Sequence, residues 1–125
     1  MRSEFHLSIG VRSIEESVDF FASVMEAKVM HRDASGYVNI DLFGHQITLK
    51  DNPAIKANLP DFHFGINLDL DTFNRIAEKI LETGRQHVAK EPEIWDAGTS
   101  IERKKMYLKC PTGYLIELKG YKSAA

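Results

Sequence analysis

The chain has 125 residues, of which 43% are hydrophobic and 27% charged, a mixture usual for one globular domain and unlike that of disordered or collagen-like chains. Its formal net charge of −2 carries no excess of Lys and Arg, so we expect no nucleic-acid partner. Cys110 is the one cysteine, no signal peptide is recognisable, and no apolar run approaches the roughly 20 residues of a membrane-spanning helix. We therefore expect a cytoplasmic protein with no membrane partner.

The first half of the chain contains signals for a strand, a helix and three further strands. A strand begins at Phe5, and three more are expected at residues 28–33, 36–43 and 45–50. Between them, Ser13 and Glu16 form a capping box that starts a helix. The helix carries one apolar stripe, which consists of Ile14, Val18, Phe21 and Val24 or Met25.

The second half repeats this order. A strand at residues 62–68 leads into a helix that begins near Asp69 or Asp71 and ends at Gly84, a candidate left-handed cap. Further strands are expected at residues 86–90, 103–109 and 113–120. The stretch 91–102, which contains Pro92 and Gly98, is expected to be a surface loop.

Two pairs of similar segments support the repeat. Residues 5–9 (Phe-His-Leu-Ser-Ile) resemble residues 62–66 (Phe-His-Phe-Gly-Ile), and residues 44–50 resemble residues 113–119. We predict an α+β fold in a single domain, residues 1–125. It consists of two βαβββ modules, residues 1–58 and 59–125, that form a curved mixed sheet with the helices on its convex face.

Because side chains alternate along a strand, the sequence also predicts which residues face away from the helices. The apolar side chains of the first, fifth and last strands must pack against the helices, which sends His6, His63 and Glu117 to the opposite face. Two imidazoles and a carboxylate are a familiar ligand set for a divalent metal ion and leave coordination positions open. These donors suit Fe, Mn, Ni, Co or Zn, and the sequence does not choose among them. The matching repeat positions of His6 and His63 favour a metal site over two unrelated surface histidines.

Other polar residues on this face are weaker candidates. Lys50 and Lys119 lie at equivalent repeat positions, where they would attract an anionic substrate, although solvated strand-end lysines are an equal alternative. Cys110 is expected to be a structural thiol in a hairpin. No residue is assigned as catalytic. Four aromatic side chains are candidate pocket walls or proton donors, although packing is their usual role in a small sheet; they are Tyr37, Tyr107, Tyr121 and Trp95. Solvent exposure is expected for His31, His45 and His87.

The strand-and-helix openings around His6 and His63, and the ending at residues 110–120 (Cys-Pro-Thr-Gly-Tyr-Leu-Ile-Glu-Leu-Lys-Gly), resemble the vicinal oxygen chelate superfamily. That superfamily contains glyoxalase I, extradiol dioxygenases, and fosfomycin- and bleomycin-resistance proteins. The resemblance carries its four ligand positions onto His6, Thr48, His63 and Glu117. Thr48 is a poor metal ligand, so the resemblance implies a three-ligand site, as in the dioxygenases and fosfomycin-resistance enzymes, and leaves Thr48 as a candidate substrate contact.

The resemblance leaves two classes of function open. One is a divalent-metal-dependent enzyme, of a dioxygenase, lyase or isomerase type, that acts on a small molecule with vicinal oxygens. The other is a metal-free protein that binds a drug, as bleomycin-resistance proteins do. The two histidines and the glutamate favour the enzyme, because a drug-binding protein does not require these residue types. By analogy with the superfamily, we expect a homodimer.

Overall fold

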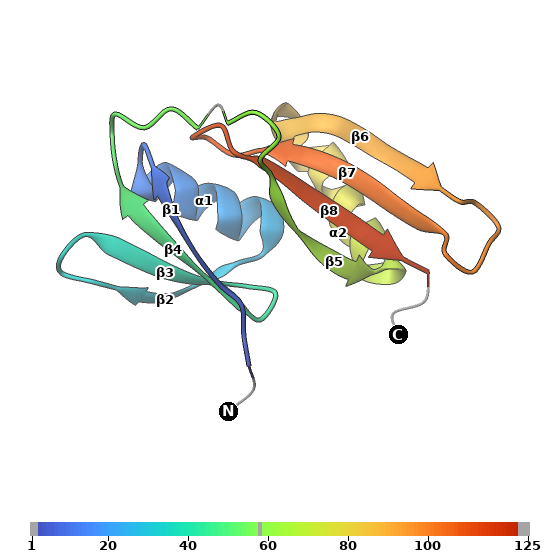
Figure 1. The fold of residues 1–125 in the computed structure, drawn as a ribbon, viewed down its shortest axis with the longest axis horizontal. Coiled ribbons are helices and arrows are strands. Elements are labelled where there is room, and N and C mark those ends of the chain that lie inside the picture. The colour runs from blue at the N-terminus through green and yellow to red at the C-terminus, as the bar shows by residue number, and fades with distance from the viewer. Residues whose placement is uncertain (1–2, 58, 123–125) are drawn as a thin grey trace. The chain divides into compact units, whose positions relative to one another are not determined.

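A computed structural model describes residues 3–57 and 59–122 of the chain. Its elements are, in chain order, β1 (His6–Val11), α1 (Ile14–Met25), β2 (Lys28–Arg32), β3 (Tyr37–Leu42), β4 (His45–Asp51), β5 (Phe64–Asp69), α2 (Leu70–Thr83), the 3-10 helix η1 (Arg85–His87), β6 (Val88–Trp95), β7 (Arg103–Lys109) and β8 (Leu115–Tyr121) (Figure 1). The chain divides into two compact units, residues 1–57 and 58–125. The division lies next to the predicted module boundary, and the grouping of both units into one domain stays a prediction.

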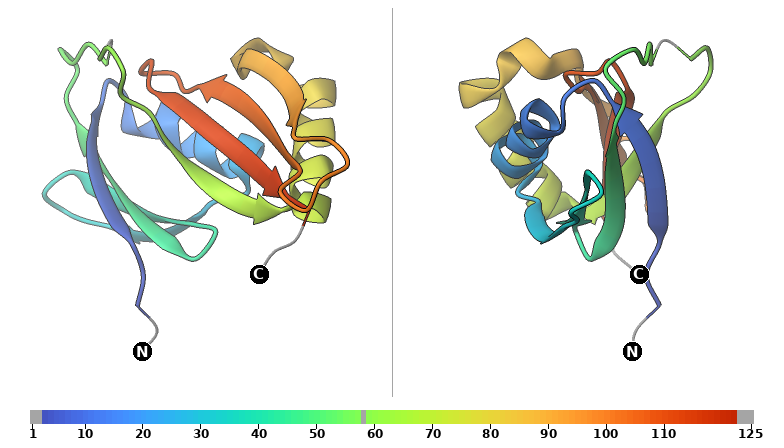
Figure 2. Two further views of the ribbon diagram at one scale, coloured as in Figure 1. Left: turned by 45° about the vertical axis from the view of Figure 1, so that its right-hand side comes forward. Right: turned by 90° about the vertical axis from the view of Figure 1, so that its left-hand side faces the viewer.

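Each unit forms its own four-stranded mixed sheet, and the two sheets have the same topology. The strand order is β1-β4-β3-β2 in the first unit and β5-β8-β7-β6 in the second. The first strand of each unit pairs parallel with the last one, and the other pairs are antiparallel. Within each unit one helix covers one face of the sheet, α1 in the first and α2 in the second (Figure 2). The predicted α+β class and the repeated βαβββ module are therefore confirmed.

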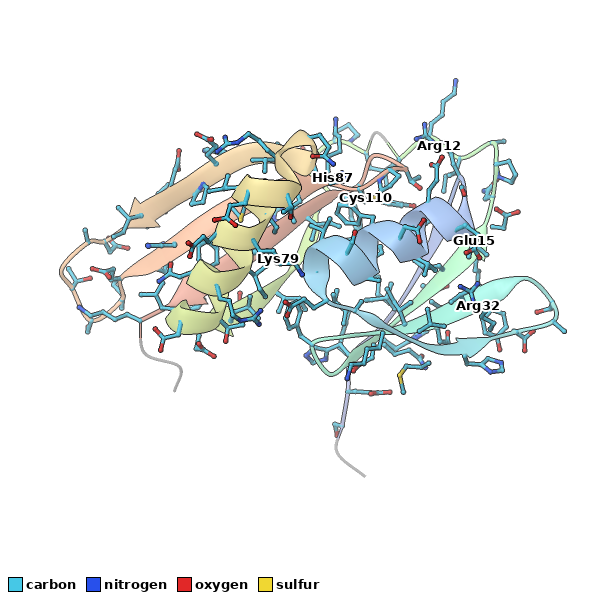
Figure 3. The ribbon with its side chains drawn as sticks, turned by 180° about the vertical axis from the view of Figure 1, so that it is seen from behind. Arg12, Glu15, Arg32, Lys79, His87 and Cys110 are labelled. Atoms are coloured by element: carbon cyan, nitrogen blue, oxygen red, sulfur yellow. The ribbon has the colours of Figure 1, made fainter. Side chains whose placement is uncertain are left out.

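In the first unit, more and less buried side chains alternate along β1 and β3 as predicted, whereas β2 is exposed throughout and Thr48 of β4 is buried between Ile47 and Leu49. The buried apolar side chains of the sheet are Ile9, Val11, Val38, Ile40, Leu42, Ile47 and Leu49, and those of α1 are Val18, Phe20, Phe21, Val24 and Met25. Ser13 is the N-cap of α1, where its Oγ accepts a hydrogen bond of 3.2 Å from the backbone N–H of Glu16. Arg32 of β2 pairs with Glu15 in the first turn of α1 at 2.7 Å, and Figure 3 shows the two side chains together.

In the second unit, α2 begins at its N-cap Asp69 and buries the apolar stripe predicted for it. The buried residues of this stripe are Phe73, Ile76, Ala77 and Ile80, and the sheet contributes Met106, Leu108, Ile116 and Leu118. Gly120 of β8 allows the close packing of α2, because a Cβ there would lie 2.5 Å from the Cβ of Phe73. In the described part of the chain, neither helix is long and apolar enough to cross a lipid bilayer.

The N-cap Asp69 makes the stability of α2 depend on pH in the acid range. Its carboxylate accepts hydrogen bonds from the backbone N–H of Thr72 at 2.8 Å and from its hydroxyl at 2.9 Å. These bonds, the backbone bond first, lower the pKa of Asp69 below its ordinary value of 3.8. Since the folded-state pKa is lowered, the stabilisation is present above the unfolded-state pKa and is lost as the pH falls through the folded-state pKa.

We therefore expect the wild type to lose more stability than Asp69→Asn when the pH falls from about 5 to about 3, because asparagine caps a helix without titrating. Thermal unfolding midpoints of both proteins at the two pH values measure the difference. Equal losses in the two proteins would show that the cap does not titrate.

The end of α2 differs from its prediction. Gly84 is not left-handed, since its φ is −133°. Its N–H donates to the carbonyl of Ile80 at 2.7 Å, and its own carbonyl accepts from the N–H of His87 at 2.9 Å, so the chain continues into the 3-10 turn η1. The left-handed cap occurs instead at Glu26 after α1, with a φ of 59°.

The surface loop predicted for residues 91–102 is wrong for its first part, because β6 continues through Pro92 to Trp95. Proline is tolerated there because β6 is an outer strand and its register with β7 shifts between Lys90 and Glu93. A residue without an N–H donor fits such an irregularity, where no regular ladder hydrogen bond is required. The connection between the two strands is therefore limited to residues 96–102.

Candidate metal centre

Two of the predicted metal ligands lie together in the second unit. His63 immediately precedes β5, which runs parallel to β8 with Gly65 opposite Glu117. The Nε2 atom of His63 lies 3.1 Å from Oε1 of Glu117. The side chain of His63 is 43% exposed and that of Glu117 is 7% exposed. The pair therefore joins a solvent-accessible imidazole to a buried carboxylate.

The second carboxylate oxygen of Glu117 lacks a hydrogen-bond partner among the described residues. Its Oε2 is buried and forms no hydrogen bond within the described part of the chain. Its Oε1 contacts His63 and lies 4.0 Å from the ammonium of Lys119. A buried carboxylate oxygen without a donor is unfavourable, and such groups are rare in folded proteins. A cation bound at this oxygen would supply the missing partner, so the donor set fits a metal ion.

Tyr107 completes the surroundings of the carboxylate. It lies opposite Glu117 in the register of β7 and β8, and its ring packs edge-on against that of His63, with 5.7 Å between centroids. Burial, then the negative charge of Glu117 and a hydrogen bond to it, raise the pKa of Tyr107 above its ordinary value of 10.0. Sequence reasoning left this tyrosine between a packing role and a role as pocket wall or proton donor. The symmetry of the β7–β8 hairpin about Thr112 is the signal that would have paired it with Glu117.

Gly65 permits the close approach of β5 to β8 at the candidate site. A Cβ on Gly65 would lie 1.9 Å from the backbone carbonyl oxygen of Glu117. A side chain at this position would therefore push apart the two strands that carry His63 and Glu117. Gly65 is thus a positioning residue, and sequence reasoning gave it no role.

The first unit has the same backbone frame with different side chains. Thr48 takes the place of Glu117, with Asn39 opposite it on β3 and Ser8 opposite it on β1. The hydroxyl of Thr48 donates a 2.7 Å hydrogen bond to Oδ1 of Asn39. This polar group therefore has its own partner within the first unit, in contrast to Oε2 of Glu117.

His6 is exposed and is the first residue of β1. It lies two residues before Ser8, and His63 lies two residues before Gly65, which is the residue equivalent to Ser8 in the second unit. The face predicted for it is therefore observed within the first unit. The described residues contain no group of three His, Cys, Asp or Glu side chains placed to hold a metal ion. The three-ligand set of His6, His63 and Glu117 stays a prediction.

The lysines named as substrate contacts differ in their surroundings. Lys50 is exposed and lies opposite Tyr37, whereas Lys119 is partly buried and lies opposite Lys105. Among the histidines left out of the site, His31 contacts Asp33 at 3.2 Å.

His45 likewise has a partner in the first unit, because its Nδ1 accepts from the N–H of Phe5 at 3.2 Å. Cys110, labelled in Figure 3, is a buried thiol at the start of the hairpin turn.

Solved structures share this fold over nearly the whole chain. A glyoxalase/bleomycin resistance protein/dioxygenase from Alicyclobacillus acidocaldarius is 23% identical with a TM-score of 0.80, and the match covers 98% of this chain and 93% of that one. A glyoxalase/dioxygenase from Nostoc punctiforme is 17% identical with a TM-score of 0.75, over 98% and 92%. The fosfomycin resistance protein FosX from Mesorhizobium loti is 16% identical with a TM-score of 0.70, over 96% and 92%.

No family model matches the sequence, and no curated protein matches it either. At these identities the structural likeness establishes a common fold. The neighbours are proteins of the vicinal oxygen chelate superfamily. The resemblance predicted from the sequence is therefore confirmed at the level of the fold, and the chemistry of the site has to be argued from its residues.

Proposed function

We propose that this protein is a divalent-metal-dependent enzyme that acts, as a dioxygenase, lyase or isomerase, on a small molecule with vicinal oxygens. His6, His63 and Glu117 would hold the metal ion. The observation that supports this proposal is the buried Oε2 of Glu117, which has no partner among the described residues, beside the solvent-accessible His63. A buried carboxylate oxygen without a hydrogen-bond donor lowers the stability of the folded protein, and a bound cation would supply the missing partner.

The residues of the second unit have distinct tasks in this proposal. When bound, the metal supplies a Lewis acid that stabilises negative charge on substrate oxygens. Glu117 offers a hard anionic oxygen, and His63 a neutral nitrogen on the solvent side. Tyr107 keeps its proton at neutral pH, since burial and the charge of Glu117 raise its pKa, and it acts as a neutral hydrogen-bond donor beside the carboxylate. Three protein ligands leave positions open for the substrate.

The metal content of the purified protein tests the proposed metal centre. The purified chain is reconstituted in turn with Fe(II), Mn, Co, Ni and Zn and compared with His6→Ala, His63→Ala and Glu117→Ala. We expect one ion per wild-type chain and an affinity at least about 100-fold lower in each variant, because loss even of residues that only support a ligand costs 10–100-fold. His45→Ala is the matched control, since this histidine lies outside the ligand set. A wild-type chain that binds no ion after reconstitution would exclude the enzyme.

A metal-free drug-binding protein is the second candidate. One structural neighbour is described as a glyoxalase/bleomycin resistance protein/dioxygenase, and two large aromatic side chains of the second unit are exposed, Phe62 at 40% and Trp95 at 44%. Exposed aromatic side chains suit a flat apolar ligand. Drug binding that is unchanged in Glu117→Ala, with no metal uptake, would favour this candidate over the enzyme.

Two further parts of the proposal concern assembly and location. Each sheet ends in outer strands, β1 and β2 in the first unit and β5 and β6 in the second, and such edges favour pairing with another chain. We propose a homodimer in the cytoplasm. The mass of the purified protein by light scattering tests the assembly, and a monomer at micromolar concentration would contradict it.

A further inference from the structure

Two lysines face each other on the sheet of the second unit, next to the candidate metal centre. Lys105 of β7 lies opposite Lys119 of β8, two residues along from the opposed pair of Tyr107 and Glu117. All four side chains therefore extend from the same face of the sheet. The adjacent Lys104 marks the other face, because its ammonium donates to Oδ1 of Asn74 on α2 at 3.0 Å.

Like charges directly opposite each other destabilise a sheet, and each ammonium here turns to a different neighbour. Lys119 lies 4.0 Å from Oε1 of Glu117, and Lys105 lies 4.7 Å from the centroid of the Trp95 ring. The carboxylate opposite Lys105 on β6 is that of Glu93, which pairs with Lys90 at 3.3 Å. Among the described residues, Lys105 thus has an aromatic ring as its neighbour and no carboxylate within ion-pair distance.

The first unit shows that the shared fold does not require this pair. The residues at the equivalent positions are Tyr37 and Lys50, which also lie opposite each other but carry one positive charge instead of two. The second lysine is therefore present in the unit that has Glu117, and absent from the unit that has Thr48 at that place. Because the lysine pair and Glu117 occur in the same unit, we connect the lysine pair with the function of Glu117.

We propose that Lys105 and Lys119 bind an anionic group, a carboxylate or a phosphate, of a substrate whose vicinal oxygens lie at Glu117; this inference rests on the proposed function. Residues two apart along a strand are separated by about 6.6 Å. The anionic group of the substrate should therefore lie about this far from its vicinal oxygens. An oxyanion between the two ammoniums removes their repulsion and gains charge-assisted hydrogen bonds. A metal ion bound to the carboxylate of Glu117 would compete with the contact between this carboxylate and Lys119, and the ammonium of Lys119 would then be available to bind the anionic group.

The test uses the full metal-free chain, so that its result does not depend on the metal. Inorganic phosphate and acetate are titrated at low ionic strength, and the affinity is measured by NMR of the protein backbone. Trp95 is the only tryptophan of the chain and reports independently, because its fluorescence changes when Lys105 leaves its ring. Binding of phosphate without detectable binding of acetate identifies a phosphate-type group, and lysine-dependent binding of both anions identifies a site that accepts a carboxylate.

We expect Lys105→Met and Lys119→Met each to weaken anion binding about tenfold, the usual effect of losing one charge-assisted hydrogen bond. Lys104→Met is the matched control, because it removes the same charge from the same strand on the opposite face, and it should bind like the wild type. Absence of saturable binding, or equal weakening in the control, overturns the inference. Metal uptake without lysine-dependent anion binding refutes this inference alone, whereas anion binding without metal uptake refutes the proposed enzyme.

Discussion

Gly65→Ala is expected to destabilise the protein by at least about 3 kcal/mol, beyond the usual range for one added methyl group in a packed region. The added Cβ would lie 1.9 Å from the carbonyl oxygen of Glu117. This oxygen belongs to the backbone of β8, so it cannot rotate away as the end of a flexible side chain does. Relief requires β5 to move off β8, which also separates His63 from Glu117. Chemical denaturation measures the free energy of unfolding, and metal titration measures the loss at the site.

Ser8→Ala is the matched control for this substitution. Ser8 occupies the equivalent place in the first unit, opposite Thr48, and its side chain is exposed. We expect its replacement by alanine to change stability by no more than about 0.5 kcal/mol. If Gly65→Ala and Ser8→Ala unfold at the same denaturant concentration, the strands accommodate a Cβ at Gly65 and this residue has no positioning role.

The alternation of apolar side chains along the last strand was sufficient to predict that Glu117 lies on the face opposite to that of Ile116 and Leu118. It worked for Glu117 because Ile116 and Leu118, its two neighbours, are both fully buried on the side of α2. Alternation does not show whether a polar group finds a partner. The lack of a donor for Oε2 of Glu117 depends on side chains of other strands and required the structure.

Cross-strand neighbours could have been found from the sequence with one further step. The turn at residues 111–113 fixes the register of β7 and β8, so that residues equally distant from Thr112 face each other. This rule pairs Tyr107 with Glu117 and Lys105 with Lys119. The extension of β6 through Pro92 could not be found in this way, because proline is tolerated there owing to a register shift that the sequence does not mark.

Glu117→Met is expected to stabilise the metal-free protein by about 1–3 kcal/mol, the usual cost of a buried polar group without a partner. Methionine has a similar length and fills the space of the glutamate side chain without a charge. The substitution also removes the contact with His63, whose imidazole is 43% exposed, and the hydrogen bond with Tyr107, so these two losses offset part of the gain. Thermal and denaturant unfolding of both proteins without metal measure the difference.

Metal ions should shift the order of stability in favour of the wild type. At a concentration of 100 times the wild-type dissociation constant, binding stabilises the wild type by about 2.7 kcal/mol, whereas a variant that binds 100-fold more weakly gains only about 0.4 kcal/mol. Glu93→Met is the matched control, because Glu93 is an exposed glutamate in the same unit whose ion pair with Lys90 contributes little. If Glu117→Met is less stable than the wild type without metal, the carboxylate is already satisfied within the fold. The proposed metal centre would then lose its main support, since the case for it is that the fold keeps an unfavourable buried carboxylate for a ligand.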